Sequence, residues 1–187
     1  MAVLDQVASD GPRRARHRRR STPYFLASLV LLAWTTVFLT APHVQTGASL
    51  HQLALFAHLA ALVLGFGAVL TLDWFGLLWM LGRQDLVTLV RVAQVAHTPI
   101  WIGLGGLTVS GALLSPDTSA PLTVVKLLAV LAVAINGLGA GRVQERLLAL
   151  EGRKPPRGLM VTAILTATVS QAGWWTATLV GFLNAQQ

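Results

Sequence analysis

Apolar residues in this chain gather into five long stretches, and polar residues concentrate in the short segments between them. A helix of about 20 apolar residues crosses the ~30 Å hydrocarbon core of a bilayer, so each stretch predicts a transmembrane helix. The first stretch is short for a span, and the second is long enough to require tilt. The pattern therefore predicts an all-α membrane bundle of five transmembrane helices. The spans cover roughly residues 24–41, 50–81, 92–114, 121–141 and 159–183.

Basic residues mark one side of this bundle. Thirteen of the 14 Lys and Arg residues precede the first span or follow the second and fourth spans. The other connections, 42–49 and 115–120, contain no basic residue. Because cytoplasmic loops are enriched in Lys and Arg, we expect the N-terminus in the cytoplasm and the C-terminus outside. The 13 residues are Arg13, Arg14, Arg16, Arg18, Arg19, Arg20, Arg83, Arg91, Arg142, Arg146, Arg153, Lys154 and Arg157.

The composition agrees with a membrane location. Hydrophobic residues make up 54% of the 187 residues and charged residues 11%, whereas about 25% of the residues in a soluble domain are charged. The net charge of +7 borders the apolar spans, where it orients the chain and attracts anionic lipid, so nucleic acid is not an expected partner. The absence of Cys excludes disulfides and Cys-ligated zinc or iron–sulfur sites.

The chain divides into two parts. Residues 1–23 form a basic segment that is too polar to fold alone, and we expect it to be disordered on the cytoplasmic side. Residues 24–187 form the transmembrane domain. A cleaved signal peptide is the alternative for the first span, but Pro42 disfavours cleavage directly after it, so we expect an uncleaved helix.

Small residues at four-residue spacing indicate which helix faces pack together, because helices in lipid approach most closely at Gly, Ala and Ser. In the second span this pattern includes Ala61 and Gly65. His58 lies on the same face as these two residues. In the fourth span, Lys126 lies about 20° from Gly137 on a helical wheel. Both His58 and Lys126 should therefore point into the bundle.

Five polar or ionisable residues within the spans are candidates for function, because such groups are costly in lipid. His58 and Lys126 fall in the outer half of the membrane. Asp73, His97 and Asn136 fall at similar depths in the inner half. We predict that these two groups are candidate ligand-binding or ion-pathway sites.

Three of the candidates also have a purely structural interpretation. Lys126 can extend to the outer interface and meet Asp117 in a loop. Asp73 can pair with an arginine near the cytoplasmic interface. His97 can hydrogen-bond Asp73, Asn136 or a backbone carbonyl.

The positions of the histidines limit the possible cofactors. A b-type haem takes axial His ligands from two helices at compatible depths, but His58 and His97 fall in opposite leaflets. Copper is therefore the more expected cofactor, with His51 and His58 as candidate ligands and His43 close by in the outer loop. The three Met residues offer no outer thioether cluster for copper(I). No nucleophile–base pair, phosphate loop, metalloprotease helix or catalytic carboxylate pair is present, so we do not expect an enzyme.

Three short motifs lie between residues 50 and 141: a segment from His58 to Gly67, the pair Ser110-Gly111, and a helix that carries Lys126. Together they resemble the membrane domain of copper-resistance D-type proteins. The resemblance implies a bacterial inner-membrane bundle associated with copper uptake or tolerance, with His58 and Lys126 at the matching polar positions. The tryptophan that this family often carries after the His is absent, and the fifth span is extra. The chain is also similar to uncharacterised actinobacterial multi-span membrane proteins.

The leading hypothesis is a multi-spanning, non-enzymatic inner-membrane protein that binds or passes copper or another small cation. One alternative is a subunit that transfers electrons through haem b, and another is a structural or accessory subunit without its own chemistry. The expected partners are the lipid bilayer, with anionic lipid at the basic tail, and a membrane protein or a second copy of the chain.

Overall fold

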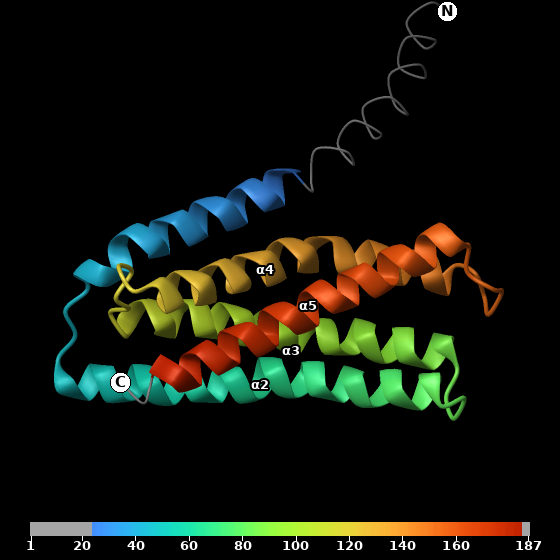
Figure 1. The fold of residues 1–187 in the computed structure, drawn as a ribbon, viewed down its shortest axis with the longest axis horizontal. Helices are drawn as coiled ribbons and strands as arrows, with labels where there is room; N and C mark the ends of the chain where they lie inside the picture. Colours follow the sequence, from blue (N-terminus) through green and yellow to red (C-terminus); the bar gives the residue numbers. More distant parts are fainter. Residues whose placement is uncertain (1–23, 185–187) are drawn as a thin grey trace, which may run out of the picture.

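The structure, a computed structural model, describes residues 24–184. The predicted disordered tail, 1–23, lies outside the described residues. The described part contains five α-helices, one short 3-10 turn and no β-strand, which confirms the all-α prediction (Figure 1). The elements are an N-terminal helix (Tyr24–Thr40), η1 (Ala41–His43), α2 (Ala48–Met80), α3 (Leu86–Leu113), α4 (Pro121–Leu148) and α5 (Arg157–Asn184).

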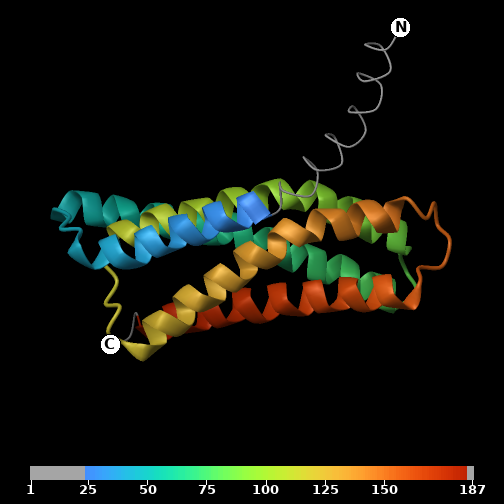
Figure 2. The same cartoon turned by 90° about the horizontal axis from the view of Figure 1, so that it is seen from above.

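The helices run lengthwise in an elongated bundle, and successive helices point in opposite directions (Figures 1 and 2). The connections α2–α3 and α4–α5 lie at one end, and η1 and the connection α3–α4 lie at the other (Figure 1). The first end carries Arg83, Arg153 and Lys154, whereas the connections 44–47 and 114–120 at the other end have no basic residue. The fold thus places the expected cytoplasmic segments together at one end of the bundle.

Two helices extend further toward this basic end than the sequence predicted. The third span was predicted to begin near residue 92, but α3 already begins at Leu86. Asp85 starts the helix, because its Oδ1 accepts a hydrogen bond from Thr88 N at 2.6 Å and so satisfies a free backbone donor. This bond holds the pKa of the Asp85 carboxyl below its usual value. At the other extended helix, α4 continues to Leu148, beyond the predicted end at residue 141.

The closest helix contact joins α2 and α3. A Cβ on Gly103 would lie 2.5 Å from Gly65 Cα and 2.8 Å from Ala61 O, so only glycine fits there. Three residues along, a Cβ on Gly106 would lie 2.8 Å from Ala61 Cβ. The small-residue stripe predicted for the second span therefore forms the α2–α3 contact, where the two backbones nearly touch.

The other helix pairs meet through different residues. In α5, Gly173 faces Val133 of α4, whose Cγ2 would lie 2.3 Å from a Cβ at that position. Between α3 and α4, Gly137 instead makes room for the Trp101 side chain. The N-terminal helix contacts α4 through Trp34, whose Nε1 donates to Leu127 O at 2.9 Å.

Apolar side chains cover the outside of the bundle as well as its core. α2 and α4 are long and apolar enough to cross a membrane. α3 contains more polar residues, yet its outward face carries Val95, Ile102 and Val109 at seven-residue spacing, with exposed fractions of 77%, 59% and 66%. The outward face of α3 is thus apolar at these three positions along its length.

The α2–α3 contact generates a prediction. Gly103→Ala should destabilise the protein by about 1–3 kcal/mol, because the new methyl meets backbone atoms that cannot move aside. The matched control is Gly105→Ala, where no atom lies within 4 Å of the added Cβ. We expect that control to be neutral or to stabilise the helix by up to ~1 kcal/mol. Unfolding in mixed micelles measures both, and equal stabilities for the two variants would contradict the prediction.

Candidate functional site

The outer polar group centres on His58 of α2 and Ser110 of α3. His58 Nδ1 lies 3.0 Å from Ser110 Oγ, and the Ser110 hydroxyl donates its proton to Gly106 O. Because Ser110 has one proton and uses it there, its oxygen must accept from His58 Nδ1–H. The neutral imidazole in this tautomer carries its lone pair on Nε2. A histidine held in this way is able to accept a proton or bind a metal through Nε2.

Lys126 of α4 joins this group. It lies within electrostatic range of His58, and its Nζ would lie 3.7 Å from a Cβ on Gly181 of α5. The alternative partner Asp117 instead accepts hydrogen bonds from Ser119 N at 2.9 Å and Ser119 Oγ at 2.6 Å, which hold the pKa of its carboxyl below the usual value. The structure thus puts the two polar residues of the family resemblance within electrostatic range of each other.

The predicted inner residues are not hydrogen-bonded to one another. Asp73 of α2 accepts from Gln171 Nε2 of α5, so its partner is an amide and not an arginine. His97 Nε2 accepts from Trp101 Nε1, one turn along α3, at 2.5 Å. Asn136 of α4 donates from Nδ2 to the carbonyl of Thr166 in α5 at 2.8 Å. The first of these three bonds thus joins α2 to α5, the second lies within α3, and the third joins α4 to α5. Each inner group therefore has its own hydrogen-bond partner.

The histidines near the outer end do not converge. His51, in the first turn of α2, is exposed. His43 Nδ1 is 3.2 Å from Leu39 O, a bond in which the ring donates. Within residues 24–184, no three His, Asp or Glu side chains are grouped so that they could hold a metal ion. A metal at His58 would therefore take no more than two ligands of these types from the described chain.

Two further polar residues in the interior were not singled out by the sequence. Trp174 of α5 is only 2% exposed, and its Nε1 has no hydrogen-bond partner among residues 24–184. The Oγ1 of Thr178, one turn later, is also buried and has no partner in the described part of the chain. The signal in the sequence was weak, because Trp and Thr are common in membrane helices and neither carries a charge.

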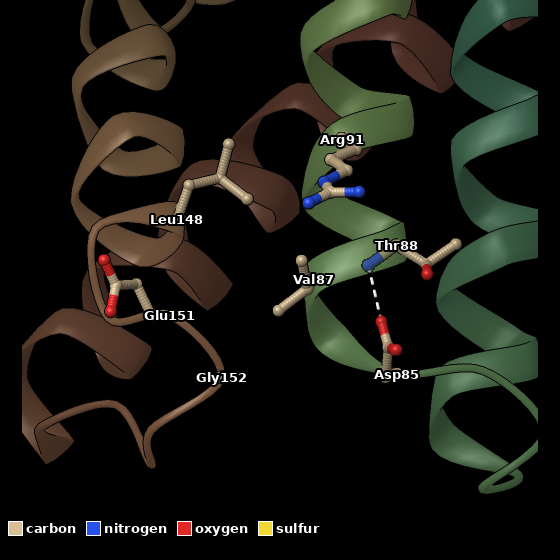
Figure 3. Close-up of a pocket in the computed structure, with 7 residues that line it drawn as sticks. All are labelled: Asp85, Val87, Thr88, Arg91, Leu148, Glu151 and Gly152. Atoms are coloured by element: carbon tan, nitrogen blue, oxygen red, sulfur yellow. Dashed lines mark hydrogen bonds between the residues drawn. The ribbon is translucent and has the colours of Figure 1, made fainter.

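A pocket of about 540 Å³ opens at the basic end, between the start of α3 and the connection α4–α5 (Figure 3). Arg91 and the Asp85 cap line the α3 side, and Glu151 lines the opposite side. The chain reverses there through Glu151 and Gly152, which have φ values of 50° and 83°. Because the lining carries charges of both signs at an exposed position, we place no chemistry in it. Its remaining lining residues are Val87, Thr88 and Leu148.

Comparison with known proteins gives no relative from which a function could be transferred. No protein-family model, no curated protein and no solved structure matches the chain. The site must therefore be judged from its own geometry.

The hydrogen bond between α2 and α5 generates the second prediction. Gln171→Leu should destabilise the bundle by about 1 kcal/mol, because it leaves the Asp73 carboxyl without its donor. The double variant Asp73→Leu/Gln171→Leu should recover most of this loss, since no polar group is then left unpaired. Gln94→Leu, at an exposed position of α3, is the control and should cost nothing. Additive losses in the double variant would show that the two side chains are not coupled.

Proposed function

We propose that this protein is an integral protein of the bacterial inner membrane with five spans, an N-terminus in the cytoplasm and a C-terminus outside. The outward apolar faces support this proposal. α5 carries Leu165, Leu179 and Phe182 at exposed fractions of 60%, 57% and 61%. A water-soluble bundle would bury such residues, whereas lipid solvates them.

The mean hydropathy of α3 and α5 understates this property, because several of their polar residues are hydrogen-bonded within or between helices. In α3 these include His97 and Ser110, and in α5 they include Gln171. A helix with one polar inward face and one apolar outward face fits a bundle in lipid. Both helices have 28 residues, which is enough to cross the ~30 Å core at ~1.5 Å per residue.

The N-terminal helix is proposed as the first span. Its 17 described residues correspond to about 25 Å at the helical rise, and the Arg-rich segment directly before it favours a cytoplasmic start. That segment would contact anionic lipid of the inner leaflet. A second copy of the chain or another membrane protein remains a proposed partner of the exposed apolar faces.

The proposed topology predicts where reporter enzymes are active. Alkaline phosphatase is active only outside the inner membrane, so a fusion after the last residue should be active. A fusion at Lys154, in the connection α4–α5, should be inactive. Reversed activities, or equal activities at both positions, would contradict the five-span arrangement.

For the activity, we propose a non-enzymatic protein that binds a small cation of the copper(I) class at His58. The observation that carries this proposal is the Ser110 hydrogen bond, which assigns the ring proton to His58 Nδ1 and the lone pair to Nε2. Imidazole nitrogen suits copper, and a fixed ring orientation strengthens metal binding. His51 is proposed as a second ligand that approaches from the outer interface.

Lys126 would regulate this site by charge. Its ammonium lies within electrostatic range of His58, so it opposes a bound cation, and the repulsion is strong where water is excluded. On the inner side of His58, the buried cluster of Val69, Leu104 and Val133 closes the interior of the bundle. A ligand at His58 would therefore enter and leave on the outer side in this conformation.

Haem b is a weaker proposal. His97 Nε2 already accepts the Trp101 hydrogen bond, and His97 and His58 belong to opposite halves of the bundle. A structural subunit without ligand chemistry is the remaining alternative, and the metal titration described next separates it from the cation proposal.

Purified protein titrated with copper(I) against a chromophoric chelator should bind one ion. His58→Ala should abolish this binding, whereas His43→Ala, at an exposed position near the outer end, should leave it unchanged. Lys126→Met should raise the affinity by about tenfold or more, because it removes a nearby positive charge. Equal binding by the wild type and His58→Ala would exclude the proposed site. A protein that binds no copper(I) would favour the structural subunit.

A further inference from the structure

Asp73 of α2 differs in position from every other side-chain carboxyl group that the structure describes. Gln171, which donates to it from Nε2, lies near the middle of α5 (Arg157–Asn184). The bond therefore holds Asp73 at the level of the middle of α5, which in the proposed topology is inside the membrane. The other described carboxyl groups are exposed and lie in connections or near a helix end; they belong to Asp85, Asp117, Glu145 and Glu151.

The surroundings of Asp73 are apolar. Leu70 and Leu77, three residues before it and four residues after it, lie on the same side of α2. Their exposed fractions are 42% and 45%, so in a bilayer they contact lipid tails on either side of the carboxyl group. An ionised carboxylate in such a setting is costly unless a cation or several hydrogen-bond donors pair with it.

No charged group among residues 24–184 reaches Asp73. Burial is the only influence on its carboxyl group, so the charged and titratable residues of the neighbouring elements lie outside electrostatic range. α5 carries no charged residue after Arg157. The residues on the other neighbouring elements are His51 and His58 in α2, Arg83 and Asp85 in the connection α2–α3, Arg91 and His97 in α3, and Lys126, Arg142, Glu145 and Arg146 in α4.

The side chain of Gln171 is complementary to the neutral form of Asp73. A protonated carboxyl group has one O–H donor beside one acceptor oxygen, and a carboxamide has N–H donors beside one acceptor oxygen. The structure already pairs Gln171 Nε2–H with Asp73 Oδ1. The other two oxygens, Asp73 Oδ2 and Gln171 Oε1, are both acceptors while the carboxylate is ionised. A proton on Oδ2 supplies the donor that a second hydrogen bond between the two groups needs.

We propose that Asp73 and Gln171 form a proton-binding site inside the membrane, in which Asp73 is protonated at neutral pH. The proton comes from water and sits on Oδ2, which donates it to Gln171 Oε1, while Gln171 Nε2 donates to Oδ1. The pair is then neutral, and each group gives and receives one hydrogen bond. Loss of the proton would leave a single bond and an unpaired charge between α2 and α5. Occupancy of the site thus sets how tightly these two helices are joined.

Labelling with dicyclohexylcarbodiimide tests the proposal, because this apolar reagent enters lipid and reacts with protonated carboxyl groups. The carboxyl proton moves to a carbodiimide nitrogen, the carboxyl oxygen bonds to the central carbon, and rearrangement gives a stable N-acylurea. In vesicles at neutral pH, mass spectrometry of the digested protein should find this adduct on Asp73. The exposed Asp117 is ionised at this pH and should carry less label by about tenfold or more. Equal labelling of the two residues, or labelling of Asp73 only in acid, would overturn the site.

Two isosteric substitutions give a matched pair of variants. Asp73→Asn should remove the label and keep the stability of the wild type, since two carboxamides can form the same pair of hydrogen bonds. Asp117→Asn, in the outer connection, should leave the labelling of Asp73 unchanged. Infrared spectroscopy provides an independent measurement, because the carbonyl band of a protonated carboxylic acid should be present at neutral pH and absent from Asp73→Asn. A wild-type protein without this band would also overturn the site.

Sodium distinguishes a proton from a metal cation as the occupant of this site. A metal ion bound to the same oxygens would displace the proton and slow the labelling along a saturable curve. We expect that replacing choline by sodium at constant ionic strength leaves the labelling rate unchanged, and a saturable slowing would overturn the proton assignment. The site rests on the proposed membrane location, which the reporter fusions test separately. It does not involve His58, so a failed copper titration leaves it unaffected.

Discussion

The rest of the bundle depends on the close approach of α2 and α3 at Gly65 and Gly103. The missing side chains let the two backbones come within contact distance, which in lipid is the main source of helix association. Above Gly65, the Trp174 indole occupies the space that a side chain would fill. Two turns toward the outer end, the same pairing of helices sets His58 opposite Ser110. A single steric constraint therefore positions both the core tryptophan and the candidate ligand-binding histidine.

Much of the fold could be predicted from the chain because long apolar stretches and the placement of arginines are local signals. The helix ends were less predictable. The Asp85 cap starts α3 earlier than hydropathy alone indicated, and α4 runs through Arg142 and Arg146 because charged residues beyond the apolar core are compatible with a helix. The proposed five-span arrangement is supported by the outward apolar faces, since among the described helices only α2 and α4 are apolar enough by average composition.

The candidate site was predictable residue by residue but not in its pairings. His58 and Lys126 could be placed on inward faces in the outer half of the membrane, and the structure puts them within electrostatic range of each other. The partners Ser110, Gln171 and Trp101 depend on helix rotation and on which helices are neighbours, and neither is encoded in the spacing within one helix. Trp174 and Thr178 escaped attention because their unused donors become apparent only once every neighbour is known.

The contrast between the helix contacts has a consequence for motion. α2 and α3 form one helical hairpin and meet backbone to backbone. α4 and α5 form a second hairpin, in which Gly173 of α5 lies against Val133 of α4. Each hairpin is therefore a stiff unit. Between the hairpins, contact is made by the ends of large rings, with Trp101 on Gly137 and Trp174 over Gly65. Aromatic rings slide over a glycine surface more readily than two interlocked backbones separate. The motion that this bundle resists least is thus a sliding, or shear, of one hairpin against the other. Trp174 and Thr178 of α5, whose buried donors have no partner among the described residues, lie beside the plane of that motion.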